Sequence, residues 1–380
     1  MKITINVNKL NELIDIASRF IAKNATLPIL QNIYLKADMD GLTIRATDME
    51  KYIEIQTPCT VASEWAITVN GKTLGDIART IEEENIEIST DQSNILHIQS
   101  TKDNFDINGI AASEYVALPD MPQENTISMD IYAFDKGIQK TEYAVTEKNF
   151  SPVLTGVLLK YQQEHPDTLV FVGTDSFRLA EYKAASSHNQ KDFWLIIPKT
   201  TISDVQKIAT YASANGTQEI EVKYSDNLIS FQCMAGNTKL LATSLLIQGS
   251  FPDYAREEIM PSTYNTTIIV DKNALEKAIR KIGILTRDIN NFIQIETVGA
   301  DTIIITSGKT DKGAGKTSLT AIIEGESVSF GINGKYITDF VRMIEWENIT
   351  MHIVDSQKPL ILTEKENPEY KYVIRPLVNN

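Results

Sequence analysis

Apolar residues along the chain gather in short runs, and a clear break in the pattern follows the run from Leu169 to Val172. Four apolar residues in a row without a turn former are typical of a fully buried strand. Gly173, Thr174 and Asp175 then interrupt the run, because small and turn-forming residues favour a change of chain direction. A second short strand is predicted over 177–182, so the whole segment is expected to form a tight hairpin.

The same order of residues recurs along the chain. In the segment 42–55, Thr47 and Asp48 follow an apolar run and are followed by a second strand pattern. A third version, TIIITS at 302–307, lacks the aspartate. An internal repeat of this kind must be recognised before a fold is assigned, because each copy is one structural unit. The matching positions of Asp48 and Asp175 favour a role in making the turn over a role in acid–base catalysis.

Each copy is predicted to contain one strand, one helix and three strands, in that order, twice. Apolar residues recur at helical spacing in six segments, and predicted helices cover 8–21, 72–81, 132–145, 201–211, 272–282 and 335–344, with Asn8 and Asp271 as N-caps. Linkers containing proline separate predicted domains at 1–121, 125–250 and 261–380. The predicted fold class is α+β: three repeated domains, each with two helices packed on two antiparallel sheets.

Composition indicates an ordinary globular protein of 380 residues, with 42% hydrophobic and 23% charged residues. Neither a signal peptide nor an apolar run long enough to span a bilayer is expected, and no membrane partner is predicted. Cys59 and Cys233 lie far apart, which favours buried thiols in a reducing compartment and a cytoplasmic location. The net charge of −14 argues against a nucleic-acid binder unless an acidic outer face and a basic inner face are averaged together.

Five motifs follow one another along the full length of the chain: TLPIL at 26–30, ATD at 46–48, TDSFRLA at 174–180, FPDY at 251–254 and YVIRPL at 372–377. With these motifs in this order, the chain resembles the bacterial DNA sliding clamp family, the beta subunit of DNA polymerase III. The resemblance implies a head-to-tail homodimeric ring of six domains, with twelve helices around a hole through which duplex DNA passes. The implied function is that of a DNA polymerase processivity factor, a ring-shaped clamp that encircles DNA and tethers the polymerase.

Basic residues on the predicted helices are candidates for facing the DNA. Enclosure by a ring needs only a few mobile cations near the phosphates, because a tight set of contacts would slow sliding. The DNA-facing set is Lys23, Asn24, Lys72, Arg79, Lys140, Lys199, Lys207, Arg280 and Lys335, where Asn24 takes a place that Arg often holds in the family. The alternative for each of them is an ordinary solvated helix face.

The resemblance also implies an apolar pocket for partner peptides between the second and third domains. Carried over to this sequence, the pocket residues are Leu154, Thr174, Ser176, Phe177, Arg178, Leu179, Pro252, Arg256, Val373, Ile374, Arg375, Pro376 and Leu377. Arg178 and Arg256 are expected to hold polar groups of the peptide. The alternative is a plain buried hairpin beside an edge strand. The family often has Gly-His in place of Ser176-Phe177 and Met in place of Arg375, so a different partner preference is expected.

The dimer seam implied by the resemblance joins copy one of one subunit to copy three of the other. By position in the family, Phe105 and Ile107 would contact Ile284 and Leu285 of the other subunit. Such a contact would cover apolar residues that, if exposed on an edge strand, would favour aggregation. The alternative is that these residues belong to the cores of their own domains.

Enzymatic chemistry is not predicted. The loop 307–317, SGKTDKGAGKT, departs from the Walker spacing, and the segment after it is predicted to be a strand, so the helix N-terminus that binds phosphate is missing. The four histidines lie in separate segments without ligand spacing, so no metal site and no cofactor are predicted. The expected partners are duplex DNA, the DNA polymerase III alpha subunit, a clamp loader, other clamp-binding-motif proteins and a second copy. Two alternatives stay open: a clamp-like scaffold for a different partner, or a nucleotide-using enzyme acting through loop 307–317.

Overall fold

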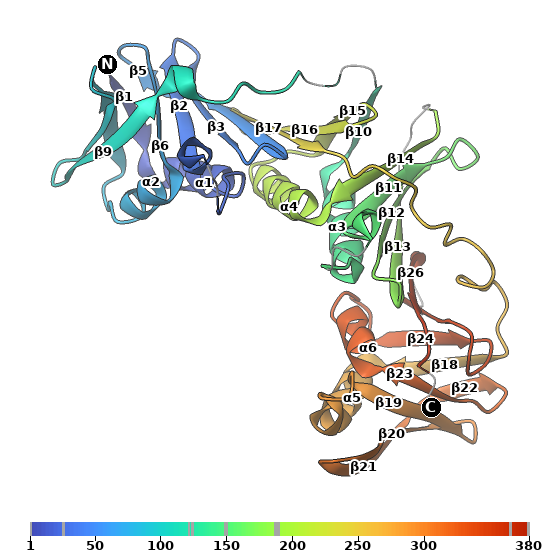
Figure 1. Ribbon diagram of the computed structural model, residues 1–380. Helices are drawn as coiled ribbons and strands as arrows, with labels where there is room; N and C mark the ends of the chain where they lie inside the picture. Colours follow the sequence, from blue (N-terminus) through green and yellow to red (C-terminus); the bar gives the residue numbers. More distant parts are fainter. Residues whose placement is uncertain are drawn as a thin grey trace. The chain divides into compact units, whose positions relative to one another are not determined.

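The computed structural model describes residues 2–24, 27–120, 122, 125–147, 151–185, 191–364 and 367–377, so Thr26 and the residues after Leu377 lie outside it. The chain forms two compact units, residues 1–135 with 197–247, and residues 136–196 with 248–380 (Figure 1).

Unit 1 is built on one sheet of thirteen strands in which every neighbouring pair is antiparallel. The order is β10 (Asn125–Asp130), β15 (Glu219–Tyr224), β16 (Leu228–Ala235), β17 (Thr238–Leu245), β4 (Lys51–Thr57), β3 (Gly41–Thr47), β2 (Asn32–Asp38), β6 (Trp65–Asn70), β9 (Asn104–Ala111), β8 (Ile95–Gln99), β7 (Asn85–Thr90), β1 (Lys2–Asn6) and β5 (Thr60–Val61). The pairing of β17 with β4 joins the second repeat to the first.

Three helices of unit 1 lie along one side of this sheet: α1 (Val7–Ala17), α2 (Gly71–Ala78) and α4 (Lys199–Ala214) (Figure 1). Helix α1 begins earlier than predicted because Asn6, and not Asn8, is the N-cap, and its side chain accepts a hydrogen bond from the backbone N–H of Lys9. Val7 is buried and therefore belongs to the apolar face of the helix instead of ending the strand. The short 3-10 helices of this unit are η1 (Pro28–Gln31) and η2 (Ala112–Glu114).

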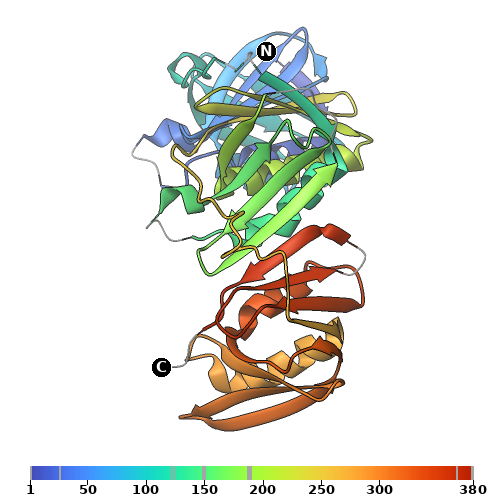
Figure 2. The same ribbon diagram turned by 90° about the vertical axis from the view of Figure 1, so that its right-hand side faces the viewer.

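Unit 2 contains a sheet of nine strands and a sheet of four. The larger sheet has the order β14 (Phe193–Pro198), β11 (Gly156–Tyr161), β12 (Thr168–Thr174), β13 (Arg178–Ala185), β26 (Asn367–Ile374), β25 (Leu360–Glu364), β24 (Asn348–Ile353), β18 (Thr266–Asp271) and β22 (Ile322–Gly325). The smaller sheet has the order β21 (Gly313–Thr320), β20 (Thr302–Thr310), β19 (Phe292–Val298) and β23 (Ser329–Asn333). Strands β13 and β26 lie side by side, and this antiparallel pair joins the second repeat to the third (Figures 1 and 2).

The helices of unit 2 end close to where the apolar pattern ends. Helix α3 (Ile131–Thr141) begins in unit 1 and ends in unit 2, and it is shorter than predicted. The 3-10 helix η3 (Glu142–Ala144) occupies the rest of the predicted helix before Val145. A second 3-10 helix of this unit is η4 (Pro152–Leu154). Helix α5 (Lys272–Thr286) begins at Asp271, whose side chain accepts from the N–H of Ala274, and this predicted cap is confirmed. Helix α6 (Gly334–Val341) packs against α5 over the core of the third repeat.

The predicted hairpin turns are confirmed in two copies. The Thr174 hydroxyl donates to the carbonyl of Arg178 at 2.7 Å, and the Thr47 hydroxyl donates to the carbonyl of Lys51 at 2.9 Å. The Asp175 carboxylate accepts from the N–H groups of residues 177 and 178, and Asp48 accepts from those of residues 50 and 51. Both aspartates therefore satisfy turn amides, as the repeat pattern predicted.

The loop 307–317 is part of a hairpin formed by β20 and β21, with an irregularity in register between Thr306 and Lys309. A strand, and not a helix, follows the GKT segment, as predicted. None of the helices in the described part of the chain is both long enough and apolar enough to cross a membrane.

Candidate partner groove and charged helix faces

A groove of about 460 Å³ opens in unit 2 beside the β12–β13 turn. Its wall residues come from η4, from the turn, from the segment 252–259, from the β24–β25 turn and from β26. Nine of the thirteen predicted pocket residues line it: Leu154, Thr174, Ser176, Phe177, Arg178, Leu179, Pro252, Val373 and Arg375. The structure therefore brings most of the predicted set into one cavity.

Four predicted pocket residues lie elsewhere. Ile374 is fully buried in the core of the third repeat, because alternate residues of β26 point to opposite faces. Arg256 projects into solvent and pairs with Asp253 at 2.9 Å. Pro376 and Leu377 follow β26, and the N–H of Leu377 donates to the carbonyl of Gly331, away from the groove.

Six lining residues were missed by the sequence reasoning: Tyr254, Glu258, Ile259, Gln357, Lys358 and Pro359. Tyr254 belongs to the FPDY motif, so its position in the sequence was the available signal. It is buried and donates to the Glu181 carboxylate at 2.7 Å, and burial raises the pKa of its hydroxyl. The segment 357–359 lies in the β24–β25 turn and carries no motif, so only the fold places it beside the groove.

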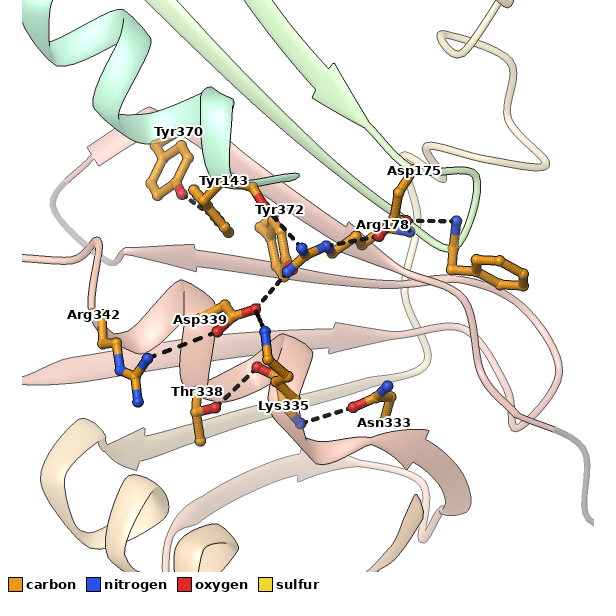
Figure 3. A network of polar contacts seen from close by, with 11 residues as sticks. Tyr143, Asp175, Arg178, Asn333, Lys335, Thr338, Asp339, Arg342, Tyr370 and Tyr372 are labelled. Carbon is orange, nitrogen blue, oxygen red and sulfur yellow. Dashed lines mark hydrogen bonds and ion pairs between the residues drawn. The ribbon is translucent and has the colours of Figure 1, made fainter. Parts of the chain in front are cut away.

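Arg178 is held by the protein itself, so it does not offer a free guanidinium to a peptide. Its Nε donates to Asp175 at 3.0 Å, one Nη donates to Asp339 at 2.7 Å, and the other donates to the carbonyl of Tyr143 at 2.8 Å (Figure 3). The Tyr372 hydroxyl lies 3.4 Å from the first Nη. The expectation that Arg178 binds polar groups of the peptide is therefore corrected: its charge fixes the turn that forms the groove wall.

Three tyrosines surround this polar cluster. The guanidinium carbon of Arg178 lies 4.8 Å from the ring centre of Tyr336 and 5.7 Å from that of Tyr143. Burial raises the pKa of the Tyr143 and Tyr372 hydroxyls, so both stay neutral hydrogen-bonding groups. Burial by itself lowers the pKa of the Arg178 guanidinium, but Tyr372, Asp339 and Asp175 together raise it above its ordinary value. The cluster therefore keeps Arg178 charged.

The predicted DNA-facing residues divide by their surroundings. Lys23, Asn24, Lys72 and Lys207 are exposed and Lys199 is half-buried. Three others are exposed but paired with a helix carboxylate: Arg79 with Asp15 and Asp76, Arg280 with Glu276, and Lys335 with Asp339. The cation of each pair is exposed, and ion pairs that water can screen are weak, so these pairs do not lock the three cations in place.

Lys140 leaves the DNA-facing set. Only 3% of the residue is exposed, and its Nζ donates to Glu364 at 2.8 Å and to the carbonyl of Met343. The Nζ also lies 4.8 Å from the ring centre of Tyr370. The prediction was wrong because the buried partner, Glu364, is remote in sequence, and a helical lysine pattern alone does not reveal it.

A second groove, of about 490 Å³, lies between α5 and α6 in the third repeat. Four cations line it: Arg280, Arg287, Lys335 and Arg342. Two of them, Arg280 and Lys335, belong to the predicted DNA-facing set. Their convergence gives this helix face a local positive charge despite the acidic total of the chain.

Comparison with protein families decides the relationship. Three family models match in order: the N-terminal domain of the DNA polymerase III beta subunit over residues 1–119, the central domain over 128–253 and the C-terminal domain over 257–378. The chain belongs to the DNA polymerase III beta subunit family. It is accordingly a sliding clamp, a DNA polymerase processivity factor built from three clamp domains.

Individual relatives agree with the family assignment. The beta sliding clamp of Staphylococcus aureus Mu50 is 26% identical over 367 residues, which cover 94% of both chains. The structure of the Bacillus subtilis sliding clamp superposes with a TM-score of 0.90 at 25% identity, covering both chains fully. The beta subunit of Thermotoga maritima has the same fold, with a TM-score of 0.90 at 22% identity and full coverage of both chains. The family is non-catalytic, and a ring of two chains is standard for it.

The residues predicted for the dimer seam differ in exposure. Ile284 is 60% exposed near the end of α5, whereas Phe105 and Leu285 are half-buried. Ile107 is only 5% exposed, so within this single chain it belongs to the core, which is the alternative to the seam position that the resemblance implied. Phe105 and Ile107 occupy alternate positions of β9 and so point to the same face of the sheet.

Two strand edges are open beside these residues. Residues 104–108 of β9 pair with β8, and the neighbouring β6 pairs only with residues 109–111, so one edge of β9 has no described partner there. In the four-stranded sheet, β21 pairs with β20 and lies at the edge of the described strands. Open edges present unpaired N–H and C=O groups that can pair with another chain.

Proposed function

We propose that two copies of the chain close head to tail around duplex DNA and hold partner proteins through the groove beside the β12–β13 turn. The observation that carries this proposal is the groove. Leu154, Leu179 and Val373 form apolar walls, and Phe177 stands at its mouth with 53% of its surface exposed. Burial of apolar peptide side chains against such walls is worth about 25 cal/mol per Å². A mostly apolar groove with a few polar groups suits a short peptide segment.

The replicative DNA polymerase III alpha subunit is the principal partner in this proposal, with the clamp loader and other clamp-binding-motif proteins as further ones. The groove also carries charges of both signs, from Glu258, Lys358 and Arg375. Arg375 stands where relatives often carry methionine, so we expect the preferred peptide to place an acidic or polar group beside it.

The test of the groove uses the alpha subunit from the same organism and the variant Phe177→Ala. Phe177 is exposed, so its loss removes contact area without opening a cavity in the core. We expect at least about tenfold weaker binding, the equivalent of about 1.4 kcal/mol. The matched control is Trp194→Ala, which removes an aromatic side chain of similar exposure on β14, outside the groove. Equal affinities of the two variants would refute the groove as the docking site.

Enclosure explains how an acidic protein can stay on DNA. The exposed cations of the helices supply a weak, sequence-independent attraction to phosphates, and the ring itself prevents escape. In the third repeat this attraction comes from the four cations of the groove between α5 and α6. We expect eight residues to face the DNA: Lys23, Asn24, Lys72, Arg79, Lys199, Lys207, Arg280 and Lys335. Lys140 is not among them, because it is buried with Glu364.

The seam in this proposal joins the open edge of β9 to the open edge of β21 of a second copy. Ile284 would then be covered by the neighbouring copy near Phe105. The chain acts by binding and not by catalysis, in keeping with its family. A clamp loader would supply the ATP-dependent opening, and the work is placed in the cytoplasm, where bacterial DNA is replicated.

A further inference from the structure

We propose that Asp339 is a positioning residue that couples the contact between Lys335 and DNA to the shape of the partner groove. The proposal rests on the function proposed above, because it takes the groove and the DNA-facing helix from there. It adds a physical link between the two: when DNA draws Lys335 away, the turn that forms the groove wall is held more firmly.

One carboxylate oxygen of Asp339 is shared by two cations. Its Oδ2 accepts from Arg178 at 2.7 Å and from Lys335 at 2.9 Å (Figure 3). The Arg178 and Asp339 side chains are 10% and 12% exposed, whereas that of Lys335 is 59% exposed. Asp339 therefore binds one enclosed cation that cannot leave and one surface cation that can.

The two cations compete for Asp339. While Lys335 is bound, it shares the acceptor and places a second positive charge beside Arg178. A DNA phosphate offers Lys335 another anion, and the move leaves the Oδ2 oxygen of Asp339 to Arg178 alone. Arg342, 4.0 Å from the other oxygen of Asp339, is a further cation of the same helix face.

Arg178 transmits the change to the groove. It is the residue at the end of the β12–β13 turn, and it ties Asp175 of that turn to α6 through Asp339. The same turn supplies Ser176 and Phe177 to the groove wall. A stronger bond between Arg178 and Asp339 therefore orders the wall, and an ordered wall binds a peptide with less loss of entropy. By linkage, a bound partner must favour the DNA contact by the same factor.

The same arrangement recurs in unit 1. Asp204 of α4 accepts from Lys51, the counterpart of Arg178 in the first turn, and its other oxygen lies 3.6 Å from Arg19. Asp204 and Asp339 are each the sixth residue of their helix. A carboxylate shared by a turn cation and a more exposed cation is thus part of the repeated unit and not a single accident of the surface.

The experiment measures hydrogen exchange of the Phe177 and Arg178 amides, which donate to Asp175 within the turn. Lys335→Met removes the competing cation and should imitate the DNA-bound state. Without DNA we expect about two- to fivefold slower exchange, the range for one exposed ion pair. A short linear duplex should slow exchange in the wild-type protein by a similar factor and leave Lys335→Met unchanged. Asp339→Asn should accelerate exchange and abolish the response to DNA.

Lys36→Met is the matched control. It also removes one partly exposed cation and its ion pair with a nearby carboxylate, but Lys36 is outside the DNA-facing set and Asp38 does not contact Arg178. Its exchange without DNA should equal that of the wild type, and its response to DNA should persist. Identical exchange in Lys335→Met and Lys36→Met, or no response of the wild-type turn to DNA, would overturn the proposal.

The readout needs no peptide, so the two proposals fail separately. If exchange responds as expected while the alpha subunit binds Phe177→Ala normally, the coupling stands and the docking site is wrong. If Phe177→Ala loses the alpha subunit while Lys335→Met behaves as Lys36→Met does, the docking site stands and the coupling is wrong.

Discussion

Lysine 140 shows that the neighbourhood of a single charge decides what it does. On sequence alone it resembles Lys207 or Lys335, a cation on an amphipathic helix. In the fold it is buried with Glu364, and this ion pair connects α3 with β25. Burying two charges is unfavourable unless both are paired, so each of them depends on the other.

Replacing Lys140 by methionine should destabilise the protein by roughly 3–5 kcal/mol, because Glu364 then stays buried without its cation. Urea unfolding measures the change. The double variant Lys140→Met with Glu364→Gln should recover most of the loss, since no buried charge remains. A single variant as stable as the wild type would show that the pair is not buried in solution.

His97 gives a prediction on pH dependence. Its Nδ1 lies 2.6 Å from the Asp106 carboxylate, and this hydrogen bond, with help from Asp91, raises the pKa of His97 above its ordinary value although burial lowers it. Because the pKa of His97 is higher in the folded state than in the unfolded state, protonation of His97 stabilises the folded protein. This stabilisation is complete below the unfolded-state pKa of about 6.5, and it is lost as the pH rises through the folded-state pKa.

Asp106→Asn should therefore lower the pKa of His97, as followed by the chemical shift of its ring protons during a titration. Asp103→Asn is the control, because Asp103 bonds to Ser100 and not to the histidine. The accompanying change in stability should stay below about 1 kcal/mol, since the pair is partly exposed. An unchanged titration in Asp106→Asn would contradict the assignment.

At the scale of elements, the turn between β12 and β13 depends on close contact with the end of α3. A Cβ atom added to Gly173 would lie 2.2 Å from the carbonyl oxygen of Thr141. Because the obstacle is backbone, no side-chain rotation can relieve the clash. The glycine that interrupts the apolar run is therefore required by packing against the end of α3.

Gly173→Ala should lower the free energy of unfolding by roughly 1–3 kcal/mol or more. Gly283→Ala is the opposite case, because nothing lies within 4 Å of the added carbon and the residue is inside α5. That variant should gain roughly 0.5–1 kcal/mol from the better helix propensity of alanine. Thermal unfolding should show a lower melting temperature for Gly173→Ala and a higher one for Gly283→Ala than for the wild type. A stabilised Gly173→Ala would refute the close approach of Gly173 to the Thr141 carbonyl.

Element boundaries show how far local pattern reaches. The buried faces of α1 and α5 are those that the apolar spacing predicts, including Leu10, Leu13, Leu275 and Ile279. The starts and ends shift by a few residues, because caps and tertiary contacts compete at helix termini. The short strand β5 was not predicted at all, since two residues carry no periodic pattern.

At the scale of the whole molecule, the proposed ring depends on contact between copies. Ile284→Lys should weaken self-association at least about tenfold, a change of about 1.4 kcal/mol. Because Ile284 is 60% exposed, the substitution should leave the fold of one chain intact. Sedimentation analysis across a dilution series measures the effect.

The control for this variant is Ile322→Lys, at a residue of similar exposure on β22 of the same repeat. It should associate as the wild type does. If both variants behave alike, Ile284 is an ordinary surface residue and the proposed seam is wrong.

Local sequence by itself determined the repeat, the class of each long element and the two Thr-Asp turns. These features depend on neighbours within a few positions, where the apolar period and turn chemistry act. Only the tertiary structure decided that Arg178 and Lys140 are enclosed anchors, that Ile107 is buried, and that residues 357–359 line the groove. The physical reason is that electrostatic interaction and burial depend on distance in space, and the fold brings partners together that lie more than a hundred residues apart in sequence.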